Sequence, residues 1–336
     1  MQISHYHIAT VSTVGLIGSF YVYYLYKEKF KKRINLAQEW VHIGHLKQMY
    51  AYPIKSCAPI LLNQAECSPM GLRNGWIRDR VLMVVDAGNN TFVTAKVYPE
   101  LLKVKTSLKR ALLKLEHPDM ETIEVNLAEV VVTQQPYQIA IWNTPMPIYD
   151  CGQQVNKWFT KCLNAKEKKF RLIYYGSERN ESRVGMRQMF NKCIKPRPGE
   201  VVYNIINEAS VDELNTRLKS IKVSEANFRP MFLLSGAKPY DEENWKYVKV
   251  GENIFEIIKP STRCVSTAID PETGMHITNM EPANLLKSRR GCADPEMRKL
   301  IGDLPCMGVQ MVLRSHPGGG PISVNDPIYV TYKLMH

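Results

Sequence analysis

The sequence predicts an α+β, mainly β protein whose folded part is preceded by one transmembrane helix. Short apolar runs separated by turn residues extend through most of the chain after residue 44 and are typical of β-strands. Signals for amphipathic helices occur at only two places. An uncharged segment long enough to span a bilayer lies near the N-terminus. With 336 residues, the remainder can form one large or two intermediate domains.

Residues 8–26 form the predicted membrane anchor. The run carries no formal charge, and at about 1.5 Å per residue a helix of this length spans ~28 Å, close to the hydrocarbon thickness of a bilayer. The first Lys or Arg of the chain is Lys27, and residues 27–43 form a basic flank and linker. Because this flank should stay in the cytosol, the remainder is expected there too. A cleaved signal peptide has the reverse charge order, and a buried N-terminal core helix is the alternative.

The predicted strands share alternating or continuous apolar character and have turn residues at their ends. They cover residues 80–86, 91–94, 122–126, 130–133, 139–142, 254–258 and 322–330. The first two are joined by Ala-Gly-Asn-Asn at 87–90 and form a predicted hairpin. Glycines and prolines at 317–321 predict a turn before the last strand.

Two segments carry helix signals. Residues 152–163 place apolar side chains, Trp158 and Phe159 among them, at helical spacing. Ser210-x-x-Glu213 has the pattern of a capping box ahead of further apolar residues. Both predicted helices are interpreted as structural. The polar, basic segment 179–199 is interpreted as a domain connection or a loop.

Composition limits the possible partners and the compartment. Lys plus Arg exceed Asp plus Glu by 44 − 32 = 12, which favours anionic partners such as a phosphorylated cofactor, an acidic protein or a membrane surface. No recognition helix, zinc finger or aromatic RNA-binding motif is present, so nucleic acid is not an expected partner. The eight cysteines are scattered without C-x-x-C spacing, which argues against a zinc ribbon and favours a reducing compartment.

Cys264 is the candidate functional thiol. It follows the predicted strand 254–258, stands beside Arg263, and has Ser and Thr hydroxyls on both sides. A guanidinium and hydrogen-bond donors favour the thiolate, which is a soft metal ligand and a nucleophile. A buried structural thiol is the open alternative, because buried cysteine is common. A cysteine protease is less favoured, since no motif identifies a partner histidine.

Three clusters could bind an anion. Lys55-Ser56 follows a Tyr-Pro turn, Arg78-Asp79-Arg80 enters a predicted strand, and Asn227-Phe-Arg229 precedes an apolar run. Arginine forks suit phosphate and carboxylate oxygens. Taken alone, each cluster is better explained as solvated surface charge. Neither a P-loop nor a G-x-G-x-x-G cradle is present.

Taken in order, these motifs resemble the MOSC family, and within it the mitochondrial amidoxime-reducing components. The resemblance rests on Tyr-Pro-Ile-Lys-Ser-Cys at 52–57, Met-Gly-Leu-Arg to Arg-Asp-Arg at 70–80, Asn-Phe-Arg-Pro at 227–230, and Arg-Cys to Asp-Pro-x-Thr-Gly at 263–274. It implies an N-terminal MOSC-type β-rich domain at 44–178 and a MOSC β-barrel domain at 179–333. Molybdopterin would be held between them.

The resemblance also implies roles for individual residues. Cys264 would be the molybdenum ligand, and Thr267 would hydrogen-bond in its surroundings. The implied contacts to the pterin and its phosphate are Lys55, Ser56, Arg80, Asn227, Arg229, Thr262 and Arg263. Thr262 replaces the serine typical of the family but keeps the hydroxyl. Residues 199–204 depart from the family pattern, so no contacts are carried over to them.

The implied activity is reduction of N-hydroxylated compounds: amidoximes, hydroxylamines and hydroxamic acids. Electrons would come from NADH through cytochrome b5 reductase and cytochrome b5. The implied location is the outer mitochondrial membrane, single-pass, with the catalytic part in the cytosol; the endoplasmic reticulum is the alternative. Two other interpretations remain open: a MOSC-type sulfur carrier, and a binding protein that stores the cofactor without reductase activity.

Overall fold

The computed structural model describes most of the chain after the predicted anchor. The described residues are 39–68, 71–141, 144–165, 167–175, 202–219, 221–292, 294–314 and 319–333. The chain divides into two compact units, Met1–Val41 and His42–His336, and the second carries the sheets. The anchor predicted at 8–26 and the segment at 179–199 lie outside the described residues. None of the helices within the described ranges is long and apolar enough to cross a membrane.

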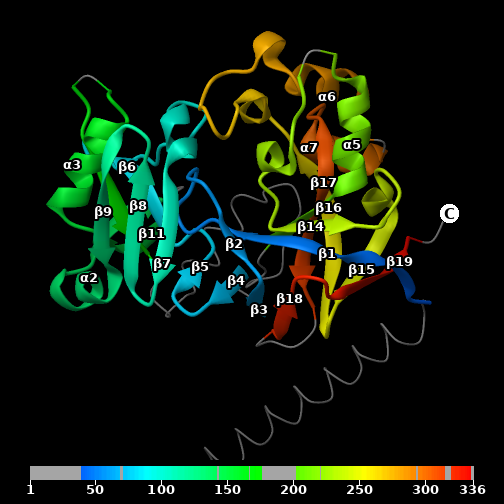
Figure 1. Ribbon diagram of the computed structural model, residues 1–336, viewed down its shortest axis with the longest axis horizontal. Coiled ribbons are helices and arrows are strands. Elements are labelled where there is room, and N and C mark those ends of the chain that lie inside the picture. Colours follow the sequence, from blue (N-terminus) through cyan, green and yellow to red (C-terminus); the bar gives the residue numbers. More distant parts are fainter. Residues whose placement is uncertain are drawn as a thin grey trace, which may run out of the picture. The chain divides into compact units, whose positions relative to one another are not determined.

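The largest sheet has eight strands, and seven of them form a closed ring (Figure 1). In ring order the strands are β14 (Phe232–Ser235), β13 (Val202–Asn207), β17 (Cys306–Leu313), β16 (Asn253–Thr262), β15 (Trp245–Val250), β19 (Pro327–Tyr332) and β1 (Val41–Ala51). The ring closes because β1 pairs with β19 on one side and with β14 on the other, in register His45↔Ser235. β2 (Ile60–Leu62) is added to the outside of β1. The barrel therefore combines six strands from the C-terminal half with one from the N-terminal half.

The barrel interior is filled by large apolar side chains that alternate along the strands. Tyr203 and Phe232 stack with ring centroids 5.7 Å apart, and Phe255 meets Tyr203 edge-on at 5.0 Å. Trp245 is fully buried in the same cluster. Such aromatic pairs contribute roughly 0.5–1.5 kcal/mol each beyond the area that they bury. The ends of the barrel strands are thus fixed well enough to position the loops that follow them.

Three smaller sheets complete the β-structure of the described residues. The first contains β10 (Tyr137–Ile141), β11 (Thr144–Asp150), β12 (Phe170–Tyr174) and β6 (Leu82–Asp86); the second contains β18 (Pro321–Ser323), β3 (Gln64–Ser68), β4 (Gly71–Asn74) and β5 (Ile77–Arg78); the third contains β7 (Lys105–Lys109), β8 (Leu112–His117) and β9 (Met120–Asn126). The prediction of a mainly β fold is confirmed.

The helices of the described residues are short. They are α2 (Leu127–Thr133), α3 (Gln153–Cys162), α5 (Glu208–Arg217), α6 (Ala283–Arg289) and α7 (Pro295–Ile301), with 3-10 turns η1 (Pro99–Lys103), η2 (Glu225–Phe228), η3 (Asp241–Asn244), η4 (Val265–Ala268) and η5 (Thr278–Met280). Of these, α2, α3 and α5 contact strands. Figure 1 shows α5, α6 and α7 grouped at one end of the barrel strands.

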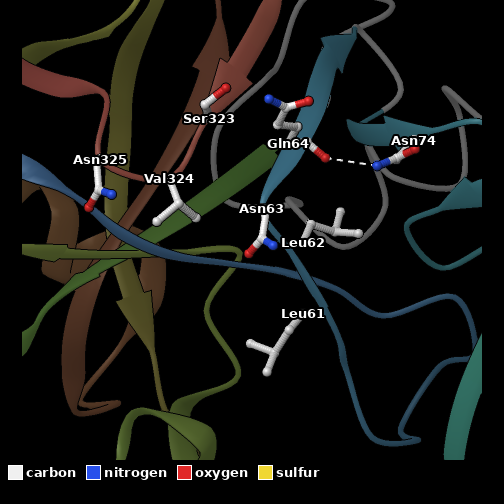
Figure 2. A pocket seen from close by; sticks show the side chains of 8 residues that line it. All are labelled: Leu61, Leu62, Asn63, Gln64, Asn74, Ser323, Val324 and Asn325. Carbon is white, nitrogen blue, oxygen red and sulfur yellow. Dashed lines mark hydrogen bonds between the residues drawn. The ribbon is translucent and has the colours of Figure 1, made fainter.

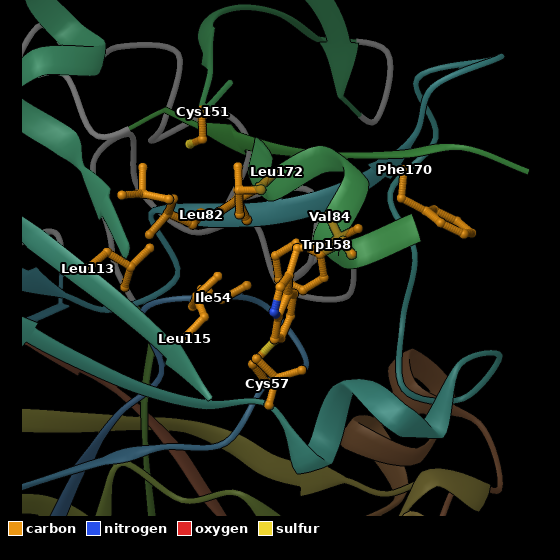
Figure 3. Close-up of a cluster of buried hydrophobic side chains, with 14 of the residues drawn as sticks. Ile54, Cys57, Leu82, Val84, Leu113, Leu115, Cys151, Trp158, Phe170 and Leu172 are labelled. Atoms are coloured by element: carbon orange, nitrogen blue, oxygen red, sulfur yellow. The ribbon is translucent and has the colours of Figure 1, made fainter. Parts of the chain in front are cut away.

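A second core holds the N-terminal sheets to α3 (Figure 3). Trp158 and Phe159 on α3 are buried against Leu82 and Leu172 of neighbouring strands, as the helical spacing predicts. The predicted strands at 122–126 and 254–258 are confirmed within β9 and β16. The predicted hairpin is reduced to β6 and a single bridge, Val85↔Phe92. The region 322–330 forms two strands, β18 and β19, instead of one.

Two local predictions were wrong, and side-chain capping explains both. Residues 130–133 belong to α2 instead of a strand, because the Asn126 side chain accepts hydrogen bonds from the N–H groups of Ala128 and Glu129 and starts a helix. The helix predicted after Ser210 is α5. It begins at Glu208 with Asn207 as its N-cap, so Ser210 does not form the expected capping box. The Ser210 hydroxyl donates instead to the buried carboxylate of Glu242.

Candidate functional site

Cys264 lies where the barrel strand β16 has just ended. It is the N-cap residue of η4, and its carbonyl accepts hydrogen bonds from the Thr267 N–H at 3.1 Å and the Thr267 hydroxyl at 2.9 Å. These bonds tighten the chain into a turn, so the thiol is presented outward. Among the seven cysteines that the structure describes, Cys264 is the exposed one and the other six are buried. The alternative of a buried structural thiol is therefore excluded for this residue.

The hydroxyl of Ser266 is 3.1 Å from the Cys264 sulfur. The sequence analysis counted this serine among the hydroxyls that could favour the thiolate, but did not name it as a residue of the metal site. A spacing of two residues brings the hydroxyl to the sulfur because η4 curls the chain immediately after Cys264.

Arg263 points inward, in contrast to its neighbour Cys264. Its Nη1 donates to the Phe228 carbonyl at 2.6 Å, and its Nε and Nη2 both donate to the Met307 carbonyl, at 2.9 Å for Nε. Burial lowers the pKa of the guanidinium to about 10, and the nearby thiols of Cys306 and Cys264 act against this decrease. Arg263 therefore joins the end of β16 to η2 and to β17.

Asn227 also holds the turn that contains η4, through hydrogen bonds of its side chain. Its side-chain oxygen accepts from the Ser224 N–H at 3.1 Å, and its Nδ2 donates to the carbonyls of Thr267 at 3.2 Å and Ile269 at 3.4 Å. The side chain is 9% exposed. The Asn227 amide and the Arg263 guanidinium both donate to backbone carbonyls. Both residues therefore fix the position of η4.

A cluster of cations surrounds the ring of Tyr52. The Arg229 guanidinium lies 4.3 Å from the ring centroid and donates to the Cys57 carbonyl at 2.6 Å. The Arg80 guanidinium lies 5.6 Å from the same ring and forms an ion pair with the fully buried Asp79 at 2.7 Å. Both arginines have left-handed backbone conformations, each with φ of 49°. Tyr52 belongs to the motif at 52–57, but the sequence analysis did not assign it to the site.

Lys55 and Ser56 are placed by the residues on either side of them. Ile54 and Cys57 are fully buried in the second core (Figure 3), and the Cys57 N–H donates to the Ile54 carbonyl at 3.2 Å. This tight turn, with Ser56 at φ of 72°, leaves Lys55 and Ser56 half-buried at its tip. The Lys55 ammonium lies 3.3 Å from the centroid of the Phe92 ring.

The cations of this cluster repel one another. Burial and then the charge of Arg80 lower the pKa of Lys55 to about 7. Burial lowers the pKa of Arg229 as well, and the Arg80 charge adds to the decrease. Asp79 is the carboxylate paired with Arg80. Three crowded cations and one paired carboxylate leave excess positive charge, which suits an anionic group.

The thiol and the cation cluster are connected through Arg263. Its charge interacts with both Cys264 and Tyr52, which places the two groups within electrostatic range of one residue. Thr262 ends β16 beside them, half-buried and in register with Cys306. The structure thus brings the predicted site residues into one region, although Asn227 and Arg263 use their side chains for internal bonds.

A second group of possible metal ligands is internally satisfied. Glu100, His117 and Asp119 present ligand atoms within 4.8 Å of one another. The Lys103 ammonium already lies between the two carboxylates, at 2.8 and 3.2 Å. Because the Asp119 N–H donates to His117 Nδ1, the hydrogen of the neutral ring is on Nε2, which faces Glu100 at 3.0 Å. A lysine ion-pair network explains this cluster without a metal.

An open hollow of about 740 Å³ lies beside β2 and β3 (Figure 2). It is lined by carboxamides and aliphatic side chains, among them Asn63, Asn325 and Val324, and the Asn74 amide donates to the Gln64 carbonyl at 2.9 Å. It contains no titratable side chain and none of the predicted site residues. It therefore offers neither a proton donor nor a counter-charge for chemistry.

Comparison with known proteins agrees with this architecture. Residues 43–166 match the MOSC N-terminal beta barrel domain, and residues 181–329 match the MOSC domain. The chain belongs to the MOSC family.

The chain is similar to several proteins named mitochondrial amidoxime-reducing component 1 or 2. The chain is 31% identical over 305 residues to mitochondrial amidoxime-reducing component 1 of Homo sapiens, covering 89% of this chain and 86% of the relative. It is 32% identical over 298 residues to mitochondrial amidoxime reducing component 2 of Rattus norvegicus, covering 85% and 83%. It is 28% identical over 334 residues to the component 1 protein of Danio rerio, covering 96% and 94%.

Proposed function

We propose that this chain is a molybdenum-cofactor-dependent reductase of N-hydroxylated compounds. The observation that carries the proposal is the exposed thiol of Cys264 on a hydrogen-bonded turn, in the same region as a half-buried group of cations that repel one another. The relatives' names, which refer to amidoxime reduction, support the choice of substrate class.

The donor set fits a molybdenum cofactor in its chemistry. Thiolate is a soft ligand suited to a heavy metal, and Cys264 would be that ligand. Lys55, Arg80 and Arg229 would hold the phosphate, because an anion would offset the burial, and the smaller repulsion from Arg80, that lower the pKa values of Lys55 and Arg229. Ser56 and Thr262 would supply hydroxyls to the pterin. When bound, the cofactor supplies the two-electron chemistry that removes oxygen from nitrogen.

The chain's own contribution is position and electrostatics. Thr267 fixes the Cys264 carbonyl, and Asn227 and Arg263 hold the turn to the neighbouring elements. This rigidity keeps the thiol at one position relative to the cations. Arg229 and Arg80, whose guanidinium groups both lie over the Tyr52 ring, would orient the anionic end of the cofactor by their charge.

We further propose that electrons come from NADH through cytochrome b5 reductase and cytochrome b5, and that residues 8–26 anchor the chain. The net charge of +12 is compatible with an acidic haem protein as donor. The outer mitochondrial membrane is the proposed location, supported by the relatives' names, and the endoplasmic reticulum is the alternative. The domain division at 178/179 stays a prediction, because it falls in an interval that the structure does not describe.

The decisive experiment compares Cys264→Ser with Cys151→Ala after expression in a host that makes the cofactor. Cys151 is buried, so its variant is the matched removal of a different thiol. We expect Cys264→Ser to keep its fold and lose benzamidoxime reduction, because a hard hydroxyl replaces a soft thiolate. The Cys151→Ala variant should remain active.

Wild-type rates from metal-loaded Cys264→Ser would refute the proposal. A persulfide on Cys264 without molybdenum would favour the sulfur carrier instead. Cofactor that binds but accepts no electrons from cytochrome b5 would favour a storage protein.

A further inference from the structure

Resting on the proposed function, we propose that Ser266 is a positioning residue that sets the electron density on the Cys264 sulfur. The short contact between the Ser266 hydroxyl and the sulfur, 3.1 Å, is the observation that leads to it. From the sequence, this serine was one of several hydroxyls that could favour the thiolate, and it had no assigned role toward the metal.

The contact is held in place by the turn that carries it. Both hydrogen bonds from Thr267 to the Cys264 carbonyl close the loop around Ser266. Asn227 fixes the far end of the same turn through the carbonyls of Thr267 and Ile269. Ser266 is half-buried, and its contact with the sulfur lies at the protein surface, so these backbone bonds hold the hydroxyl in place. The hydroxyl is therefore preorganised beside the proposed metal ligand.

The chemistry of the ligand fixes the direction of this hydrogen bond. A thiolate bound to a metal has no proton, so the Ser266 hydroxyl must donate and the sulfur must accept. A donated hydrogen bond withdraws electron density from the sulfur and weakens its donation to the metal. The lower oxidation state of the metal is then stabilised, and the reduction potential rises. Hydrogen bonds to ligating sulfurs tune other metal centres in this way.

The test is a set of variants loaded with cofactor and titrated redox-potentiometrically, with the electron paramagnetic resonance spectrum of the half-reduced metal as a second readout. We expect Ser266→Ala to lower the midpoint potential and to shift the spectrum. A tenfold change in the equilibrium between two oxidation states of the metal corresponds to ~59 mV for a one-electron couple. Ser266→Thr keeps a hydroxyl and should restore both values toward those of the wild type.

Thr267→Val is the matched control in the same turn. Its hydroxyl bonds to the Cys264 carbonyl and not to the sulfur, so removal should lower thermal stability while changing the potential much less than Ser266→Ala does.

A molybdenum-loaded Ser266→Ala protein with wild-type potential and spectrum would overturn the role of Ser266 and leave the proposed function intact. Equal shifts in Ser266→Ala and Thr267→Val would also overturn it, because they would indicate general loosening of the turn. A wild-type chain without molybdenum would overturn the proposed function, and the role of Ser266 with it.

Discussion

Replacing Arg263 by lysine tests whether this residue holds the Cys264 turn together. The guanidinium spans two backbone carbonyls, those of Phe228 and Met307, and also lies 5.4 Å from the Phe228 ring. A lysine keeps the charge but can reach only one of the carbonyls. The charge-assisted interaction with the other carbonyl is then lost, roughly 1.5–3 kcal/mol, together with the ring contact, about 0.5–1 kcal/mol. We expect the free energy of unfolding to fall by ~2–4 kcal/mol.

Urea unfolding of the cofactor-free protein, followed by tryptophan fluorescence, measures this change. The control is Arg217→Lys, because Arg217 forms an i,i+4 ion pair with Glu213 and its side chain is 51% exposed. Solvent screens exposed ion pairs strongly, so the control should lose little stability. If Arg263→Lys is as stable as the control, the bonds of Arg263 do not hold the turn. Unchanged stability with lost molybdenum would indicate that Arg263 contacts the cofactor instead.

Three further predictions follow from other residues. Arg229→Ala should lower the molybdenum and pterin bound per chain, measured after gel filtration, whereas Arg217→Ala should not; equal retention would contradict a phosphate role for Arg229. Burial and Arg80 lower the pKa of Lys55 from 10.5 to about 7, so the unfolded chain binds more protons across this range. The stability of the cofactor-free protein should therefore rise with pH between these values, by up to ~1.4 kcal/mol per pH unit, and calorimetry should find that rise missing in Lys55→Met. Asn126→Ala should cost ~1 kcal/mol by removing the cap of α2; an unchanged urea midpoint would argue against the cap.

Local signals in the sequence identified elements whose determinants are close together in the chain. The spacing of Trp158 and Phe159 predicted α3 because one face of that helix packs on a sheet. The apolar run at 130–133 was misread as a strand because valines favour strands, while the cap at Asn126 determines the outcome. Apolar residues in a short run can predict a strand, but one capping side chain can make the same residues form a helix.

At the site, the sequence indicated which residues gather but not what their side chains bond. The motifs predicted that Arg263, Arg229 and Asn227 lie near Cys264 or the anion cluster. Nothing in the motifs indicated that Arg263 would reach the Met307 carbonyl, 44 positions away, instead of solvent or a ligand. The proposed contacts of Arg263, Arg229 and Asn227 with the cofactor stay predictions. The orientation of a long cationic side chain depends on which carbonyls the folded backbone leaves without partners, and this is a tertiary property.

The pairing of β1 with β14 has a consequence for synthesis of the protein on the ribosome. His45 and Ser235 are 190 positions apart, so β1 leaves the ribosome long before its partner exists. At about 5–20 residues per second, the delay is roughly 10–40 s. During that time the apolar face of β1 has no barrel to enter and its edges are open to other chains. A chaperone that shields nascent strands should therefore increase the yield of this protein more than the yield of one whose sheets form between neighbours in the sequence.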